Sequence, residues 1–228
     1  ISNISHDFRS PLTSIHGYAQ AMLDGTIPYE AQEKYLNIIL SETDRLTNLT
    51  SNLLELNSFN GDNVLLDITT FNICETIVQT VNTLEGTAAK KEISFVLDYN
   101  TQKELLVEAD ESKIHQVLYN LIDNAVKFSH NNSEIKISLR KKGAKVFVSV
   151  KDSGIGIPKE SLNKVFDRFY KTDISRGKDK RGTGLGLSIS KEIVQAHNQT
   201  INVVSTVDVG TEFVFTLKYH SKKQEASS

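Results

Sequence analysis

The apolar residues of the first 59 positions recur at helical spacing, and this pattern constrains the fold of the chain more than any other feature. At about 100° per residue, the first set falls within one sector of roughly 80°, as on an amphipathic helix. It consists of Ile4, Phe8, Leu12, Ile15, Ala19 and Met22. The second set is spaced like a heptad repeat and consists of Ile39, Leu46, Leu49, Leu53 and Leu56. Gly25 and Pro28 separate the two sets and predict a turn.

A lone helical hairpin cannot bury both stripes. Pairing with a second copy of the chain buries them, so residues 1–59 predict an α-helical hairpin that forms one half of a dimeric four-helix bundle. The polar, breaker-rich stretch that follows, residues 60–65, is interpreted as a linker.

Residues 66–221 show a different pattern, in which short strand-like runs alternate with helices. The strand-like runs are residues 64–68, 94–99 and 105–108. The helical runs are residues 73–90, 112–128 and 187–197, and two hairpins are expected at 135–151 and 201–218. Helices combined with largely antiparallel strands predict an α/β two-layer sandwich. Residues 222–228 are expected to form a disordered tail.

The composition excludes several classes of protein. A formal net charge of −2 gives no electrostatic reason to expect a nucleic-acid partner. No run of about 18 apolar residues occurs, so no membrane span is expected. Cys74 is the only cysteine, which excludes an intrachain disulfide and fits a reducing compartment. Because the chain starts at Ile1 without an initiator methionine, we expect a fragment of a longer sensor, with any membrane anchor in segments that it lacks.

His6 is the first residue that suggests chemistry. Helical geometry places it nearly opposite the apolar stripe, so it would face solvent beside the Asp7 carboxylate. That carboxylate could orient or deprotonate the imidazole. Ser10 lies four residues further on and shares the same face, and Pro11 would bend the helix next to it. The alternative interpretation is an ordinary surface histidine on a coiled coil.

Asn120, Asn124 and Lys127 fall on one face of the helix expected at 112–128. Amide oxygens can ligate a hard cation such as Mg²⁺, which takes its other ligands from water and nucleotide phosphates. A nearby lysine would meet a phosphate as a point charge. A plain polar helix face is the alternative.

Asp152 follows an expected strand directly and precedes Gly154 and Gly156. A carboxylate accepts hydrogen bonds only, which suits an exocyclic amine such as that of adenine, while the glycines let backbone approach a flat ligand. The alternative is a simple turn.

A glycine-rich block at residues 182–188 opens an expected helix, an arrangement that predicts a phosphate cradle. It matches neither the GxGxxG nor the GxxxxGK[ST] pattern. The stretch before it, residues 159–181, is basic, and its later part is interpreted as a lid over polyphosphate. A solvated run of charges is the alternative interpretation.

The order of these blocks resembles that of the H, N, G1, F and G2 boxes of bacterial sensor histidine kinases. The F block is Phe166-Asp167-Arg168-Phe169-Tyr170, and the resemblance covers nearly the whole chain. It implies a dimerisation and histidine phosphotransfer domain at 1–59, joined through 60–65 to a GHKL-type catalytic ATP-binding domain at 66–221.

The resemblance also implies roles for individual residues. His6 would accept the γ-phosphoryl group of ATP, Asp7 would act as general base or orienter, and Asn120 and Asn124 would hold Mg²⁺. Asp152 would accept from adenine. The remaining residues implied at the nucleotide site are Lys127, Gly154, Gly156, Arg168, Tyr170, Gly182, Thr183, Gly184, Leu185, Gly186 and Leu187.

Two positions separate the alternatives. Hydrolytic relatives of the gyrase and chaperone type carry Glu where this chain has Asn120. An amide cannot serve as the base that activates water, so a GHKL-type ATPase is the disfavoured alternative. A pseudokinase scaffold and a Ser/Thr kinase on the same fold are also disfavoured. Ser10 retains a hydroxyl at a position that helps to place water in the family, which implies phosphatase activity toward a response regulator.

The expected partners are therefore a second copy of the chain, through residues 1–59, and a cognate response regulator. No nucleic acid is expected, and the membrane would be reached only through segments absent from this chain. The expected location is cytoplasmic, as part of a membrane-anchored bacterial sensor.

Overall fold

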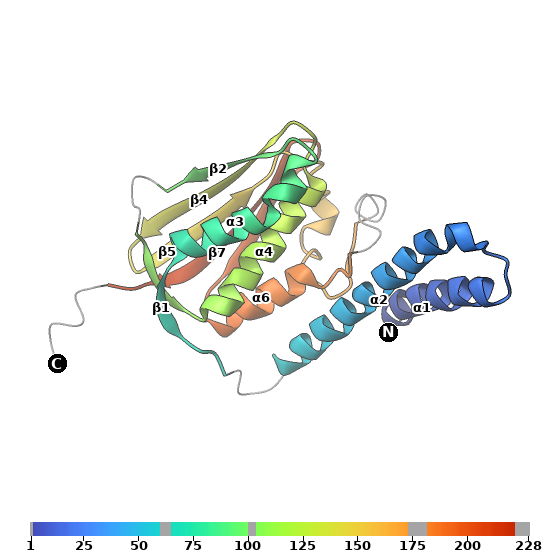
Figure 1. Ribbon diagram of the computed structural model, residues 1–228. Coiled ribbons are helices and arrows are strands. Elements are labelled where there is room, and N and C mark those ends of the chain that lie inside the picture. The colour runs from blue at the N-terminus through green and yellow to red at the C-terminus, as the bar shows by residue number, and fades with distance from the viewer. Residues whose placement is uncertain (1, 60–64, 100–103, 173–181, 222–228) are drawn as a thin grey trace.

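The computed structural model describes residues 2–59, 65–99, 104–172 and 182–221. Its first part is a hairpin of two long helices, α1 (Ser2–Leu23) and α2 (Tyr29–Ser58) (Figure 1). The turn between them contains Gly25 with φ +76°, and Asp24 Oδ1 accepts a hydrogen bond of 3.0 Å from the Thr26 amide. Both helices and the turn between them therefore match the expectation from the apolar spacing.

The second part is an α/β domain with one seven-stranded sheet. Its elements in chain order are β1 (Thr69–Asn72), α3 (Ile73–Ala89), β2 (Ser94–Asp98), β3 (Leu106–Ala109), α4 (Glu111–Phe128), β4 (Glu134–Lys142), β5 (Lys145–Lys151), a 3-10 turn (Lys159–Ser161), α6 (Gly186–Ala196), β6 (Ile201–Thr206) and β7 (Gly210–Tyr219). The strand order is β1-β3-β7-β5-β4-β2, with β6 also paired to β7. Among the strands of the described residues, only β2 and β4 pair in parallel.

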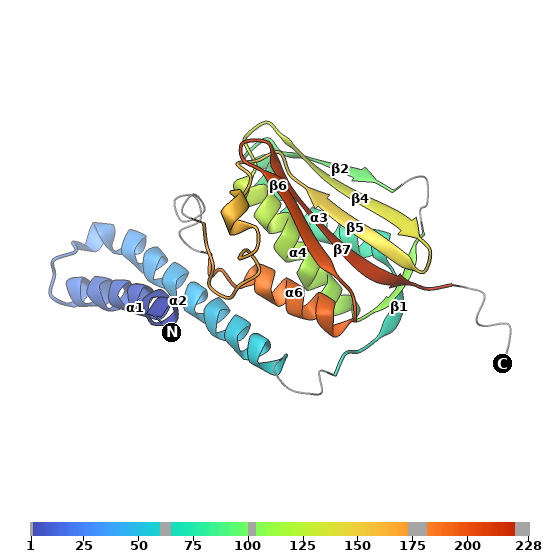
Figure 2. The same cartoon turned by 180° about the vertical axis from the view of Figure 1, so that it is seen from behind.

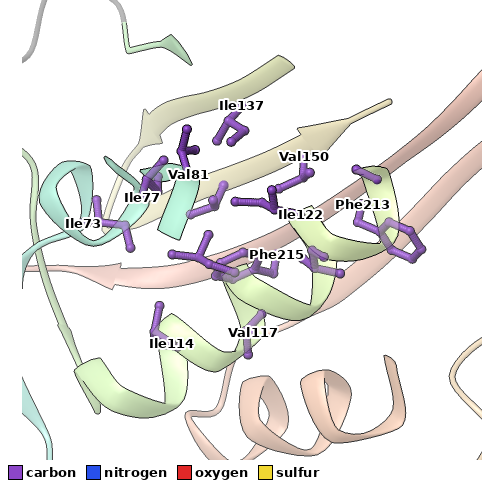
Figure 3. Packing of buried hydrophobic residues seen from close by; sticks show 14 of the residues in the cluster. Ile73, Ile77, Val81, Ile114, Val117, Ile122, Ile137, Val150, Phe213 and Phe215 are labelled. Atoms are coloured by element: carbon purple, nitrogen blue, oxygen red, sulfur yellow. The ribbon is translucent and has the colours of Figure 1, made fainter. Parts of the chain in front are cut away.

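Helices α3, α4 and α6 cover one face of this sheet, and the view from behind shows the strands of the opposite face (Figures 1 and 2). The core lies between the two layers. Figure 3 shows Ile77 of α3 and Ile122 of α4 directed toward Ile137 and Val150 on the sheet, all of them buried. This arrangement confirms the α/β two-layer sandwich.

The sequence misplaced one strand. Residues 65–68 are not in a strand, and the first strand is Thr69–Asn72, which pairs antiparallel with β3; residue 64 lies outside the described residues. The run at 64–68 is apolar, but Leu65 and Ile68 are exposed. The pairing partner, rather than local composition, therefore sets where this edge strand begins.

The C-terminal half of α2 lies against the α/β domain, beside α6 (Figures 1 and 2). Leu49 and Leu56 are buried within the same hydrophobic cluster as the core of that domain. Glu55, between them, accepts hydrogen bonds from Lys113 Nζ (2.7 Å) and Gln116 Nε2 (2.6 Å) on α4. The heptad stripe was expected to face a bundle partner, and at these two leucines it instead faces the second domain.

Among the described residues, no helix is both long and apolar enough to cross a membrane.

Candidate functional site

The histidine and its neighbours lie on α1 as expected. The His6 side chain is 81% exposed, and its Nδ1 lies 3.8 Å from Oδ1 of Asp7, whose side chain is 21% exposed. That separation exceeds a hydrogen bond. Ser10 is also exposed, one helical turn further on. Phe8, between them, packs against a hydrophobic cluster that includes Leu49 and Leu56 of α2 as well as the α/β core.

A pocket opens in the α/β domain between the C-terminal half of α4, the loop after β5 and the start of α6. Ten residues implied as nucleotide-binding line it: Asn124, Lys127, Asp152, Gly156, Tyr170, Gly182, Thr183, Gly184, Gly186 and Leu187. The structure thus brings together residues of the N block, such as Asn124, and residues of the G2 block, such as Gly184, which lie far apart in the sequence. Four implied residues do not line the pocket, namely Asn120, Gly154, Arg168 and Leu185.

Asp152 lines this pocket and is 6% exposed. Its Oδ1 accepts hydrogen bonds from the amides of Gly154 (2.9 Å) and Thr211 (3.2 Å). Among the described residues no donor reaches Oδ2, which leaves that oxygen for a ligand. Burial raises the pKa of Asp152 to about 6, against the opposing effect of the two amide hydrogen bonds. The carboxylate is therefore ionised at neutral pH, although its charge is poorly solvated.

The two glycines after Asp152 serve the protein's own packing. A Cβ on Gly154 would lie 2.3 Å from the Phe128 carbonyl oxygen. Gly156 has φ +67°, and a Cβ there would lie 2.1 Å from the Thr206 carbonyl oxygen. The sequence predicted close approach of this backbone to a ligand. Close approach to neighbouring backbone is what excludes a side chain at both positions.

Helix α4 supplies the polar side of the pocket. Asn124 and Lys127 line it, and Lys127 Nζ lies 2.7 Å from the Asp123 carboxylate. Asn120, one turn earlier, donates through Nδ2 to the Gly186 carbonyl (3.2 Å) and to Ser190 Oγ (3.4 Å) on α6. These bonds fix which end of the amide faces α6. No group of three or more His, Cys, Asp or Glu side chains in the described ranges could hold a metal ion.

The glycine-rich block leads into the N-terminus of α6. Gly182, Thr183 and Gly184 line the pocket, and Gly186 begins the helix, so amides of the first turn face it and can meet an anion. Leu185 is fully buried and anchors the loop in the core. Leu185, which was assigned to the nucleotide site from the resemblance, therefore does not line the pocket.

The F block lies beside this loop. Arg168 Nη2 lies 3.5 Å from Glu192 Oε1 on α6, and the Tyr170 hydroxyl donates to Ser161 Oγ at 2.9 Å. The Phe169 amide donates to the Gly184 carbonyl at 3.0 Å. Lys171 Nζ contacts the Gly182 carbonyl oxygen. Residues 173–181 of the expected lid lie outside the described residues.

Several lining residues were not assigned from the sequence. Lys171 and Thr172 lie within the basic stretch 159–181, and that run of basic residues was the available signal. Thr211 and Phe213 come from β7, and nothing local marks them, because only the pairing of β7 with β5 brings them to the pocket.

Two family profiles match the chain. Residues 1–61 match the His Kinase A (phospho-acceptor) domain, and residues 109–221 match the histidine kinase-, DNA gyrase B- and HSP90-like ATPase. Together they define a class of protein in which a histidine-bearing helical hairpin precedes an ATPase-type domain. The chain belongs to the two-component sensor histidine kinases.

Individual relatives agree with this assignment. The chain is 35% identical over 230 residues to the sensor histidine kinase WalK of Bacillus subtilis (strain 168), a match that covers 99% of the chain but only 37% of WalK. It thus spans well under half of that relative.

Solved structures agree as well. The catalytic domain of histidine kinase ThkA matches with a TM-score of 0.60 and 35% identity, over 67% of this chain and 96% of ThkA's. The complex of ThkA with the response regulator protein TrrA matches with a TM-score of 0.77 and 31% identity, over 98% of this chain and 61% of that one.

Proposed function

We propose that this chain is an ATP-dependent protein-histidine kinase, which transfers the γ-phosphoryl group of ATP to His6 and then to an aspartate of a response regulator. The observation that carries the proposal is the presence in one chain of an exposed His6–Asp7 pair and a pocket that contains a buried carboxylate and the start of a glycine-rich helix.

The chemistry at His6 needs a neutral imidazole. The Nε2 lone pair attacks the γ-phosphorus, the bond from phosphorus to the β,γ-bridging oxygen breaks, and ADP leaves with the bonding electrons. The imidazole then carries a positive charge, which is relieved when Nδ1 gives its proton to the Asp7 carboxylate. Orientation and proton transfer of this kind contribute about 10²–10⁴-fold to a rate.

The pocket residues suit ATP. Asp152 Oδ2 would accept from the adenine amine, and the amides at the start of α6, with Lys127 and Arg168, would meet the phosphates. Asn120 and Asn124 would supply neutral oxygen ligands for Mg²⁺, which binds few protein ligands and many phosphate oxygens. Mg²⁺, when bound, neutralises charge on the phosphate oxygens. The absence of a carboxylate cluster in the described ranges fits a cation held largely by the nucleotide.

The amide at Asn120 favours phosphotransfer over hydrolysis. Its Nδ2 is bound to α6, and a neutral amide cannot remove a proton from water. A GHKL-type ATPase without histidine phosphotransfer, the alternative, would need such a base. Ser10, exposed on the same face as His6, supports an additional phosphatase activity toward the phosphorylated regulator.

The partners follow from exposed surface and from relatives. Leu12, Leu36 and Leu40 are 53%, 50% and 62% exposed on helices that are long and amphipathic, which supports homodimerisation through residues 1–59. ThkA was solved with a response regulator, and we extend that class of partner to this chain. A cytoplasmic location, with any anchor in segments outside this chain, remains part of the proposal.

The test is incubation of the chain with γ-labelled ATP and Mg²⁺, followed by acid or alkali. We expect labelling that alkali preserves and acid removes, as for a phosphoimidazole, and that His6→Gln abolishes. His16→Gln is the matched control, because His16 is also exposed on α1. Labelling that survives in His6→Gln would refute the acceptor, and phosphate release without labelling would favour the ATPase.

A further inference from the structure

The last five residues of α4 include three that line the pocket, Asn124, Lys127 and Phe128. An α-helix leaves the carbonyl oxygens of its last four residues without partners inside the helix. At this helix end, the partners of those carbonyls decide how rigidly the pocket residues are held.

Two of the four carbonyls are bound by local backbone. The Ala125 carbonyl accepts from the Ser129 amide at 2.9 Å. The Phe128 carbonyl accepts from the Ile155 amide, in the loop that follows Asp152, at 3.2 Å.

The other two are bound by a single side chain. Lys91 Nζ donates to the Val126 carbonyl at 2.8 Å and to the Lys127 carbonyl at 2.6 Å. A lysine at a helix C-terminus also interacts favourably with the helix dipole. Lys91 is only partly exposed and does not line the pocket.

The backbone of Lys91 is fixed in turn. It lies in the tight turn between α3 and β2, where the Ile93 amide donates to the Ala88 carbonyl at 3.1 Å and Glu92 has φ +56°. The Lys91 carbonyl accepts from the Asn132 amide at 2.9 Å. Helices α3 and α4 lie side by side (Figure 1), so the lysine reaches across from one helix end to the other.

We propose that Lys91 is a positioning residue of the nucleotide site, which sets the direction of Lys127 and Asn124 by binding the last carbonyls of α4. The inference rests on the proposed function, since it assumes that these side chains meet phosphate and Mg²⁺. It assigns Lys91 no contact with the nucleotide itself. Loss of Lys91 should therefore impair recognition of the phosphates and leave recognition of the base by Asp152 intact.

The test compares two ligands in the full chain, Mg·ATP and adenosine, which has the base but no phosphates. For Lys91→Met we expect about tenfold weaker binding of Mg·ATP, a loss of the size expected when part of the energy of two charge-assisted hydrogen bonds is lost. Adenosine should bind within about twofold of its affinity for the parent chain. Lys91→Arg, which can still donate to both carbonyls, should restore most of the ATP affinity. Lys90→Met is the matched control for loss of charge, because Lys90 is exposed and adjacent, and it should bind like the parent.

Equal weakening for both ligands would mean a purely structural role and overturn the proposal, as would unchanged ATP affinity. If Lys91→Met does not fold, Lys91→Gln decides by the same comparison, because its amide is too short to bind both carbonyls and it keeps a polar side chain. Failure of the unsubstituted chain to bind Mg·ATP would instead refute the proposed function.

Discussion

Asp152 combines burial with an ionisable group at the site proposed for adenine. Only in its ionised form do both oxygens act purely as acceptors, Oδ1 for the Gly154 and Thr211 amides and Oδ2 for the adenine amine. Burial raises the pKa of Asp152 to about 6. We expect the ATP affinity of the chain to rise as the pH rises through about 6 and to level off above neutrality. Equilibrium binding of a fluorescent ATP analogue across this range measures the effect.

Asp152→Asn should remove this pH dependence and weaken ATP binding by about 10- to 100-fold, as expected for a hydrogen bond to a charged group. Its amide oxygen can still accept from Gly154 and Thr211. Folding favours the neutral form of Asp152, so this group's contribution to the free energy of unfolding is greatest below its unfolded pKa of 3.8 and decreases as the pH rises through about 6. The variant should therefore unfold at a temperature no lower than that of the parent at pH 7.5. If the pH dependence of ATP affinity is the same in the variant as in the parent, the assignment of Asp152 to adenine is contradicted.

Ser10→Ala should spare labelling of His6 and slow dephosphorylation of the regulator, because the serine hydroxyl is proposed to place water and not to accept phosphate. Ser14→Ala, one turn further along α1, is the control and should alter neither activity. The measurement is the half-life of the phosphorylated regulator with each variant. Equal loss of labelling and dephosphorylation would point to a distorted helix.

The sequence indicated which residues lie near the pocket more reliably than it indicated what those residues contact. Asp152 and Lys127, which the pattern singled out, both line the pocket. The pattern also marked Gly154 and Leu185, which do not line the pocket but hold its loops against the core. A local motif cannot distinguish residues of this kind from residues that contact the ligand. Arg168 is ion-paired to Glu192, and that partner lies on another element.

At the scale of the element, α4 depends on its N-cap residue as well as on Lys91. The N-cap Asp110 accepts through Oδ1 from the Lys113 amide at 3.1 Å and through Oδ2 from the Asp67 amide at 3.2 Å. The helix start is thereby joined to the segment that enters β1. Capping by Asp or Asn satisfies an amide that the helix leaves without a partner.

Asp110→Ala should lower the free energy of unfolding by about 0.5–2 kcal/mol, measured by urea denaturation. Asp110→Asn is the comparison variant. Asparagine caps about as well as aspartate but has no second oxygen for the Asp67 amide, so this variant should lose less than Asp110→Ala. Equal losses in the two variants would mean that the cap contributes little to this helix start.

Most elements were predictable because each carries its own periodicity. The helices at 73–90 and 112–128 and both hairpins agree with the structure to within a residue or two. The edge strand β1 was not predictable, because Thr69–Asn72 shows no alternation of polar and apolar residues. Its position is defined by its register with β3.

For the whole molecule, the contact between α2 and the α/β domain is the feature that the heptad pattern did not reveal. The apolar spacing of Leu49 and Leu56 shows that a face is buried, but not by which partner. The polar contact beside them, Glu55 with Lys113 and Gln116, could not be anticipated because it joins residues roughly sixty positions apart.

Glu55→Ala should loosen this contact. Loss of a partly buried charged hydrogen-bond pair costs about 1–2 kcal/mol, so amides near Leu49–Leu56 should exchange with solvent about tenfold faster. Hydrogen exchange followed by mass spectrometry measures this. Glu33→Ala, at an exposed position on the first turns of α2, is the control, and exchange that is the same in both variants would contradict a role for Glu55 in holding the domains together.

Helix α4 touches α2 at its first turns and the pocket at its last, over 18 residues, or about 27 Å. Nucleotide binding and the docking of α2 therefore both involve α4. If nucleotide changes the strength of α2 docking by some factor, docking must change the nucleotide affinity by the same factor. Residues 66–221 produced alone would lack α2, so a difference between their ATP affinity and that of the full chain would show that docking and nucleotide binding are coupled. The ratio of those two affinities measures the coupling between the halves of the molecule.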